Sequence, residues 1–288
     1  MLFLQSLIVV TGGAVRLTGS GLGCSTWPEC TPGSYAPTPN QPESSIHKWV
    51  EFSNRLLTFV LFVVALALMV AIIRTGARQL RFLGATQILG IFAQAILGGI
   101  TVLTGLNPIT VAAHFLLSIA IIAAALTLRQ SVHGMQQVSP LSGTSITQRM
   151  LKGHLLLSAV VIVVGTIVTG SGPHAGDTTA VRFNFDARTV SWIHADLVIA
   201  LLGLSLALYV SVRSGEAPEV QRILKPRITQ FLVIALAQGG IGYIQYFTGL
   251  PEAIVALHLC GAVLVWLAAW NLALAGRVVP IQSKSAGA

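Results

Sequence analysis

Two histidines, His114 and His258, stand in two copies of one sequence pattern. The segment AQAILGGITVLTGL at 93–106 resembles AQGGIGYIQYFTGL at 237–250, and the same 144-residue offset relates His114 to His258. Both lie in apolar stretches, where an imidazole is costly unless its nitrogens find a partner. A duplication that keeps an imidazole in register therefore predicts a repeated binding site.

A second histidine accompanies His258. His194 and His258 are expected near the same end of two helices that alternate along the chain, each a few residues inside the apolar stretch. Axial ligation of a haem requires such a pair, because the iron takes one nitrogen on each face of the porphyrin. A single intramembrane histidine is more often a hydrogen-bonded packing residue, and no closely spaced Cys or His cluster indicates zinc. The matched pair favours ligation.

Glu51, Asn54 and Arg55 are spaced i, i+3 and i+4, so they share one face of a predicted helix. With His114 they form the corresponding set in the first half. A carboxylate beside an apolar cavity can transfer protons, or Glu51 can form a local ion pair with Arg55. Arg55 can equally bind a haem propionate. The residues alone leave these roles open.

The composition defines the elements that must position these side chains. Of 288 residues, 54% are hydrophobic and 9% are charged, and the mean hydropathy is +0.79. These values indicate a polytopic membrane protein. An apolar run at about 1–15 is too short to cross alone and lacks the basic start of a signal peptide, so it is expected to end a first helix whose beginning is missing. Runs near the ~20 residues that cross a bilayer predict seven further helices at about 50–73, 82–104, 109–128, 150–170, 190–211, 226–248 and 253–275.

The net charge of +8 is unevenly distributed. With the N-terminus in the cytoplasm, twelve basic residues fall in inner loops and the tail, against five on the outer side. This positive-inside bias predicts two cytoplasmic termini and explains the charge without nucleic acid. Most acidic residues fall near the outer side, where chemistry that needs carboxylates is expected. The inner set is Arg74, Arg78, Arg81, Arg129, Arg149, Lys152, Arg213, Arg222, Lys225, Arg227, Arg277 and Lys284, and the outer set is Arg16, Lys48, Arg55, Arg182 and Arg188.

The chain divides into two halves of four helices. An N-terminal half, 1–130, and a C-terminal half, 148–288, are joined by a polar cytoplasmic segment at 131–147. The tetrapeptide TGSG at 18–21 recurs at 169–172, where the first helix of each half leaves the membrane. Since four spans return the chain to the same side, both halves have the same topology. The predicted fold is all-α, with eight transmembrane helices in two pseudo-symmetric four-helix bundles.

Long outer loops, at about 17–48 and 170–189, follow the first helix of each half. Cys24 and Cys30 lie in the first loop, on the oxidising side of the membrane, where a disulfide is permitted. A structural disulfide, a thiol–disulfide relay and free thiols are the alternatives. His174 lies in the second loop, in a Gly/Pro-rich stretch that can fold over a bundle mouth. Structural or surface roles are the default for the other histidines, His47, His133 and His154.

The sequence resembles the heme A synthase family over essentially the whole chain. The resemblance rests on TGGAVRLTGSGLGC at 11–24, Trp-Pro-Glu-Cys at 27–30, the stretch 51–55, and histidines near the outer ends of the fourth, sixth and eighth helices. It implies a bacterial cell-membrane enzyme that oxidises the C8 methyl of heme O to a formyl group, by two hydroxylations and loss of water. The product is the heme A that cytochrome oxidases use.

The resemblance also implies two haem sites toward the outer face. His194 and His258 would be the axial ligands of a haem b cofactor, while His114 would face the iron of the heme O substrate, with Asn54 and Arg55 beside it. Glu51 falls on the family's functionally important acid. Cys24 and Cys30 fall on the family's outer-loop cysteines, which assist haem transfer or redox delivery. Heme O synthase, an unidentified electron donor and a second copy of the chain are the implied partners, with no nucleic acid.

Asn54 departs from the family pattern, because many members have a histidine at this position. An amide is a poor iron ligand, so the resemblance implies that His114 holds the substrate iron alone and leaves one face open for the oxidising step. Alternatively, Asn54 only hydrogen-bonds the macrocycle. A non-enzymatic membrane b-type cytochrome or haem carrier is the other function that these residues would fit.

Overall fold

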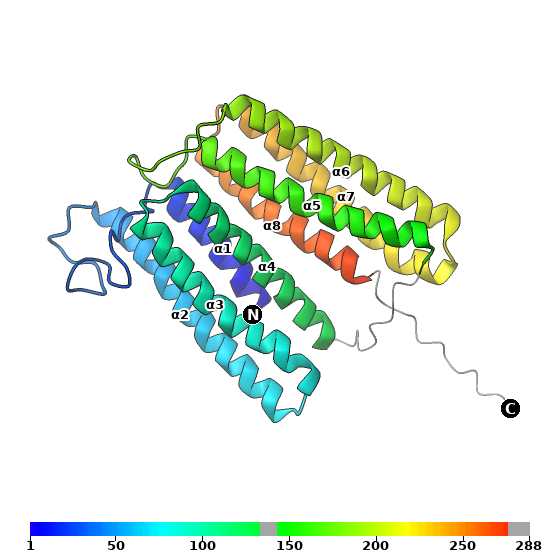
Figure 1. Ribbon diagram of the computed structural model, residues 1–288, viewed down its shortest axis with the longest axis horizontal. Helices are drawn as coiled ribbons and strands as arrows, with labels where there is room; N and C mark the ends of the chain where they lie inside the picture. Colours follow the sequence, from blue (N-terminus) through cyan, green and yellow to red (C-terminus); the bar gives the residue numbers. More distant parts are fainter. Residues whose placement is uncertain (133–142, 276–288) are drawn as a thin grey trace.

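The computed structural model describes residues 1–132 and 143–275, and these residues form an all-helical protein (Figure 1). His133, Arg277, Lys284 and most of the segment 131–147 lie outside the described residues. The predicted helical class is confirmed. The eight α-helices are α1 (Leu2–Leu17), α2 (Ser45–Arg74), α3 (Arg81–Leu103), α4 (Pro108–Val132), α5 (Ser145–Ser171), α6 (Ala187–Gly215), α7 (Pro218–Phe247) and α8 (Glu252–Ala275), and a short 3-10 helix, Arg78–Leu80, precedes α3.

Seven of these helices, α2 to α8, are long and apolar enough to cross a membrane, and α1 is a shorter apolar helix of 16 residues. Large apolar side chains on their surfaces are exposed; Phe59 on α2, for example, is 68% exposed. Such side chains are costly in water but favourable against lipid. The structure thus fits a multi-pass membrane protein.

Several helices begin earlier than their apolar runs. The Ser44 side chain accepts a hydrogen bond from the His47 amide and begins α2, while Asp186 accepts from the Thr189 amide and begins α6. Such N-caps satisfy amides that have no partner within the helix, so polar residues can extend each helix beyond the apolar span. Consequently the two long loops are shorter than predicted, at 18–44 and 172–186, and His47 lies in the first turn of α2.

The helices pack in two groups (Figure 1). Within the first, α1 contacts α2 and α4, and α3 contacts the same two helices; α5 to α8 contact one another in the same order. Between the groups, α4 contacts α5 and α8, and α1 contacts α8. An apolar cluster that includes Val9, Ile122, Ile162 and Trp266 fills this seam. The buried indole N–H of Trp266 finds its acceptor across the seam, at the Ile119 carbonyl 2.9 Å away.

The duplicated sequence adopts a duplicated turn. Gly105 and Leu106 join α3 to α4 with φ of 60° and 59°, and Gly249 and Leu250 join α7 to α8 with φ of 78° and 62°. Leucine rarely adopts this left-handed conformation. In both copies it donates its amide to a carbonyl near the helix end, that of Thr101 or Gln245. The repeat thus keeps a backbone geometry as well as residue types.

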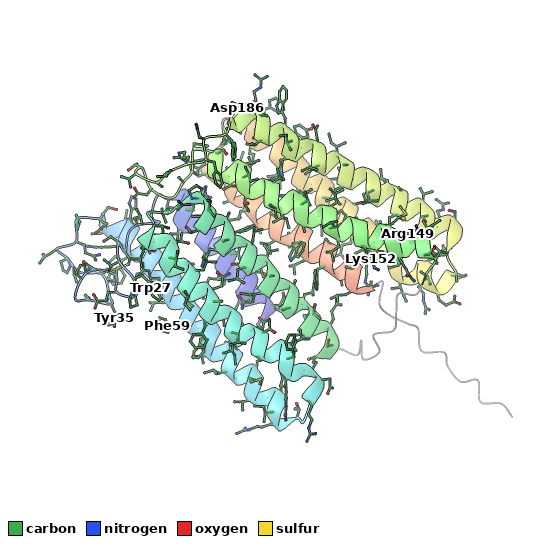
Figure 2. All side chains as sticks on the ribbon, in the orientation of Figure 1. Trp27, Tyr35, Phe59, Arg149, Lys152 and Asp186 are labelled. Carbon is green, nitrogen blue, oxygen red and sulfur yellow. A yellow bond between two sulfur atoms is a disulfide. The ribbon has the colours of Figure 1, made fainter. Side chains whose placement is uncertain are left out.

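The two long loops lie at one end of the molecule, which we call the loop end. Figure 2 places Trp27 and Tyr35 in the first loop and Asp186 at the close of the second, whereas Arg149 and Lys152 lie at the opposite end of α5. His114, His194 and His258 all belong to the turns of α4, α6 and α8 nearest the loop end. The fold therefore brings the predicted site residues to a common end of the helices.

Candidate functional site

Each of the three predicted ligand histidines faces a glycine on the preceding helix. A Cβ atom built on Gly98 of α3 would lie 3.1 Å from Cε1 of His114, and Cβ atoms on Gly165 and Gly242 would lie 3.2 Å from Cε1 of His194 and of His258. These distances are shorter than ordinary carbon contacts. Glycine at each position therefore lets the imidazole edge lie directly against the neighbouring helix.

The three imidazoles have a further property in common. Nδ1 of His114, of His194 and of His258 is buried and has no hydrogen-bond partner among the described residues. His194 and His258 also lie close enough to each other to interact electrostatically. A buried polar nitrogen without a partner is costly, and such atoms are uncommon in native structures unless they serve a ligand or a reaction.

This donor set fits a haem. The described residues contain no group of three or more His, Cys, Asp or Glu that could hold a bare metal ion. A haem needs none, because the porphyrin supplies four nitrogens and the protein adds only one or two axial ligands. Imidazoles with a buried, unpartnered nitrogen suit that role, and the paired His194 and His258 suit it best.

Asn54 occupies the corresponding place between α1 and α2. A Cβ built on Gly12 of α1 would lie 3.8 Å from the Asn54 amide nitrogen, and the Thr11 hydroxyl donates to Asn54 Oδ1 at 2.7 Å. Beside it lies a cavity of about 400 Å³, which is within the size range of small-molecule sites. Its lining residues are Thr11, Ala14, Val15, Trp49, Val50, Ser53, Asn54 and Leu57.

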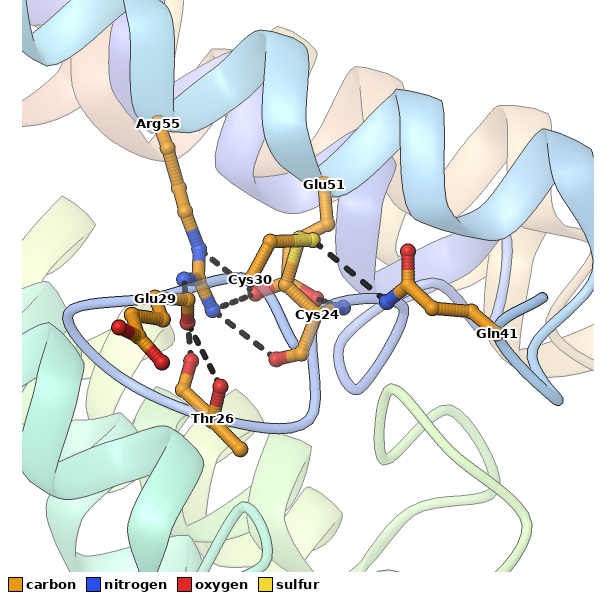
Figure 3. Close-up of polar contacts among 7 residues, drawn as sticks. All are labelled: Cys24, Thr26, Glu29, Cys30, Gln41, Glu51 and Arg55. Carbon is orange, nitrogen blue, oxygen red and sulfur yellow. Dashed lines mark hydrogen bonds and ion pairs between the residues drawn. A yellow bond between two sulfur atoms is a disulfide. The ribbon is translucent and has the colours of Figure 1, made fainter. Parts of the chain in front are cut away.

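Glu51 and Arg55 do not line this cavity; they bind the first loop (Figure 3). Glu51 Oε1 accepts from Nε and Nη2 of Arg55 at 3.1 and 2.6 Å, and Oε2 accepts from the Cys24 amide at 2.6 Å. The carboxylate is buried, with 8% of its side chain exposed. The local ion pair, one of the alternatives considered from the sequence, is therefore present.

Arg55 extends this contact to the loop backbone. Nη1 donates to the carbonyls of Thr26 and Glu29 at 3.0 and 3.2 Å, and Nη2 donates to the carbonyl of Cys24 at 2.9 Å. With the two bonds to Glu51, all five N–H groups of the guanidinium are used. In this conformation Arg55 has no donor left for a propionate. We call the Glu51–Arg55 pair and its three loop carbonyls the loop clamp.

The clamped loop contains a disulfide between Cys24 and Cys30, both fully buried. The Gln41 amide lies 3.8 Å from the Cys30 sulfur. Of the three alternatives for the pair, the structure contains the disulfide, and whether it cycles remains a prediction. Cys260 on α8 is a free, partly buried cysteine.

Trp27, in the same loop, packs against α3. A Cβ built on Gly99 would lie 2.4 Å from the Trp27 ring, closer than real atoms approach. His114 and Trp27 of the disulfide loop therefore lie against adjacent positions of α3, Gly98 and Gly99. The loop closes the loop end of α2 and α3 next to His114.

Substitution of Gly99 by alanine is expected to displace Trp27 and loosen the loop 18–44. The added methyl requires movement of the indole ring, at about 1–3 kcal/mol, the usual cost of overpacking. Limited proteolysis of the loop checks this and should be faster than in the parent protein. Gly203→Ala is the matched control, since a Cβ there meets nothing within 4 Å; equal rates for the two variants would contradict the packing role of Trp27.

Sequence reasoning missed Arg16, which joins the two halves at the loop end. Its Nε and Nη2 donate to the carbonyls of His174 and Thr169 at 2.5 and 2.9 Å. The His174 ring in turn lies 2.9 Å from the Leu250 carbonyl, which can only accept, so Nε2 is the donor. The second loop therefore contacts the end of α1 and the turn between α7 and α8. Arg16 within the motif at 11–24 was the available signal.

The sequence also did not single out Gln94 and Gln238, although both belong to the repeated segment. Gln94 Nε2 donates to the His114 carbonyl at 3.0 Å, and Gln238 Nε2 donates to the His258 carbonyl at 2.7 Å. The presence of glutamine at both positions, 144 residues apart, was the signal for them.

His154, by contrast, has a packing role: it is buried, and its Nε2 lies 3.1 Å from the Ser205 hydroxyl.

Comparison with known proteins identifies the family. The heme A synthase of Lysinibacillus sphaericus is 34% identical over 170 residues, 56% of this chain and 53% of that protein. That of Bacillus pumilus is 32% identical over 175 residues, 58% and 55%; that of Shouchella clausii is 25% identical over 282 residues, 91% and 88%. In the first two alignments the chain spans about half the length of its relative. The COX15-CtaA family model, described as cytochrome oxidase assembly protein, matches residues 1–269. The chain therefore belongs to the COX15-CtaA family of cytochrome oxidase assembly proteins.

Proposed function

We propose that this protein is a heme A synthase, which oxidises the C8 methyl of heme O to a formyl group. The observation that carries the proposal is the set of three imidazoles, each against a glycine and each with a buried, unpartnered Nδ1. Membership of the family and the names of the relatives support the same reaction. The enzyme would act in the bacterial cell membrane, with both termini cytoplasmic and the loop end on the outer face.

The C-terminal half, 148–288, would hold a haem b cofactor. His194 and His258 lie on α6 and α8, close enough for the charge of one ring to influence the other, so the two imidazoles would hold one haem between them. When bound, this haem supplies one-electron transfer. The two imidazoles hold and orient it, and the apolar packing of α5 to α8 excludes water from it.

The N-terminal half, 1–130, would bind the heme O substrate. His114 is the one histidine of this half with a buried, unpartnered Nδ1 among the described residues, so it would be the single ligand of the substrate iron. The cavity beside Asn54 would supply part of the space for the substrate. Asn54 would then hydrogen-bond the substrate rather than ligate it, because its amide is a poor iron ligand.

Glu51 would manage protons or orient the substrate at the loop end of this half. Oε2 of its carboxylate accepts from the Cys24 amide, whereas Oε1 is bound by Arg55 on the same helix, so movement of the loop would free Oε2. Arg55, once released from the loop carbonyls, could bind a propionate. Heme O synthase would deliver the substrate, an electron donor would reduce the haem b, and the protein would work alone or as a homo-oligomer.

The test is heme A formation in a bacterium that makes heme O but has no heme A synthase of its own. Cells that express this chain are expected to convert heme O to heme A. Extraction of the haems followed by chromatography separates the two pigments. A vector without insert and a His114→Ala variant are the controls. Accumulation of b-type haem on the protein with no heme A would instead identify a membrane cytochrome or haem carrier and would contradict the enzyme proposal.

A further inference from the structure

Two glutamines bind the main chain of two of the proposed ligand histidines in the same way. Gln94 on α3 and Gln238 on α7 are related by the 144-residue offset that relates His114 to His258. Each donates its side-chain amide across to the carbonyl of the histidine on the next helix, at 3.0 Å for His114 and 2.7 Å for His258. The duplication has kept an interhelical hydrogen bond as well as the imidazole.

Each glutamine lies one helical turn before the glycine that faces the same histidine. Gln94 precedes Gly98 by four residues and Gln238 precedes Gly242 by four, so glutamine and glycine share one helix face. The glutamine fixes the histidine's carbonyl, and the glycine admits Cε1 of its ring at the distance where a methyl would be too close. We call each Gln–Gly pair a histidine seat.

Each of the two glutamines has a second close contact besides the histidine carbonyl. In the first half Gln94 also donates to the Ser118 hydroxyl at 2.5 Å. In the second half a Cβ on Gly261 of α8 would lie 1.8 Å from Gln238 Oε1, so only glycine lets Gln238 approach α8 this closely. His194 has the glycine, Gly165, but Val161 stands where the glutamine would be and has no side-chain donor.

We propose that Gln94 and Gln238 are positioning residues that set the depth and rotation of His114 and His258 for the haem groups. The inference rests on the proposed function, because it assigns the seats to haem ligands. Helices in a bilayer have no hydrophobic force that fixes their mutual rotation, so interhelical hydrogen bonds and close glycine contacts decide it. Residues that orient metal ligands typically change metal affinity by about 10- to 100-fold when they are replaced.

The experiment uses the purified, haem-containing protein in detergent. Gln238→Met removes the N–H donor at nearly constant length. It is expected to speed haem transfer to added apomyoglobin by about 10-fold and to shift the low-temperature EPR signal of the oxidised haem. Gln238→Glu, which keeps an O–H donor when protonated in the apolar bundle, is expected to restore both. Gln94→Met should leave both unchanged and instead weaken the binding of added heme O, followed by absorbance titration.

Gln221→Met is the matched control, because Gln221 lies near the start of the same helix, 17 residues before Gln238, and donates to the carbonyls of Arg213 and Glu216. Haem transfer and EPR signals in Gln238→Met that equal those of Gln221→Met would overturn this proposal alone. An effect of Gln94→Met on the EPR signal as large as that of Gln238→Met would also overturn it. A parent protein without haem would overturn the proposed function, and the seats with it.

Discussion

Replacement of His258 by alanine is expected to remove b-type haem from the purified protein while the helices remain folded. His258 lies against Gly242, its Nδ1 has no partner among the described residues, and its neighbour across the half is His194. Loss of the side chain removes one ligand of the proposed haem and the hydrogen bond between the imidazole and the Gln238 main chain. One such bond contributes about 0.5–1.5 kcal/mol, so the fold should be retained. Haem per polypeptide, read from the reduced pyridine spectrum, is expected to fall by more than about 10-fold.

His194→Ala is expected to give the same loss, whereas His114→Ala should keep the C-terminal haem and lose heme A formation. His47→Ala is the control, because the contacts of His47 involve its main chain: its amide donates to Ser44, and its carbonyl faces Gly23. Circular dichroism separates loss of haem from loss of fold. Unchanged haem content in both His258→Ala and His194→Ala would refute the ligand assignment.

The helices could be predicted from the sequence because a bilayer imposes a simple rule. Every apolar run near ~20 residues must be a helix, since no other local structure satisfies its own backbone in lipid. The ends were less accurate, because caps such as Ser44 and Asp186 add polar turns that hydropathy does not register. The repeat at 144 residues likewise predicted that His114 and His258 would stand at equivalent places, and the matching φ values of Leu106 and Leu250 agree with this.

The contacts between elements could not be predicted in the same way. Spacing alone placed Glu51 and Arg55 on one face, and the i,i+4 ion pair was one alternative. That Arg55 binds three loop carbonyls depends on the path of the loop 18–44, which no periodic pattern specifies. The glycines facing each imidazole depend on how neighbouring helices rotate. Periodicity predicts elements, whereas irregular backbone and close packing decide what those elements bring together.

Replacement of Glu51 by glutamine is expected to weaken the loop clamp. The amide keeps one acceptor oxygen but loses the charge, so Arg55 is left without a counterion. Breaking a buried pair from one side costs about 3–5 kcal/mol. Because 20% of the Arg55 side chain is exposed and its bonds to loop carbonyls remain, we expect a smaller cost of about 2 kcal/mol. The Cys24–Cys30 disulfide should then be reduced more than tenfold faster by a water-soluble phosphine.

Heme A formation decides whether Glu51 does more than hold the loop. Arg55→Met is the matched variant, because it breaks the same ion pair and loosens the same loop but keeps the carboxylate. If Glu51 manages protons or orients the substrate, Glu51→Gln abolishes heme A formation with haem retained, whereas Arg55→Met lowers it only in proportion to loop opening. Equal losses in the two variants, tracking the rate of disulfide reduction, would leave Glu51 only its part in the clamp. Undiminished heme A formation in Glu51→Gln would exclude a catalytic role and leave Glu51 as a structural residue of the loop clamp, because its contacts to Arg55 and the Cys24 amide are tested separately by the rate of disulfide reduction.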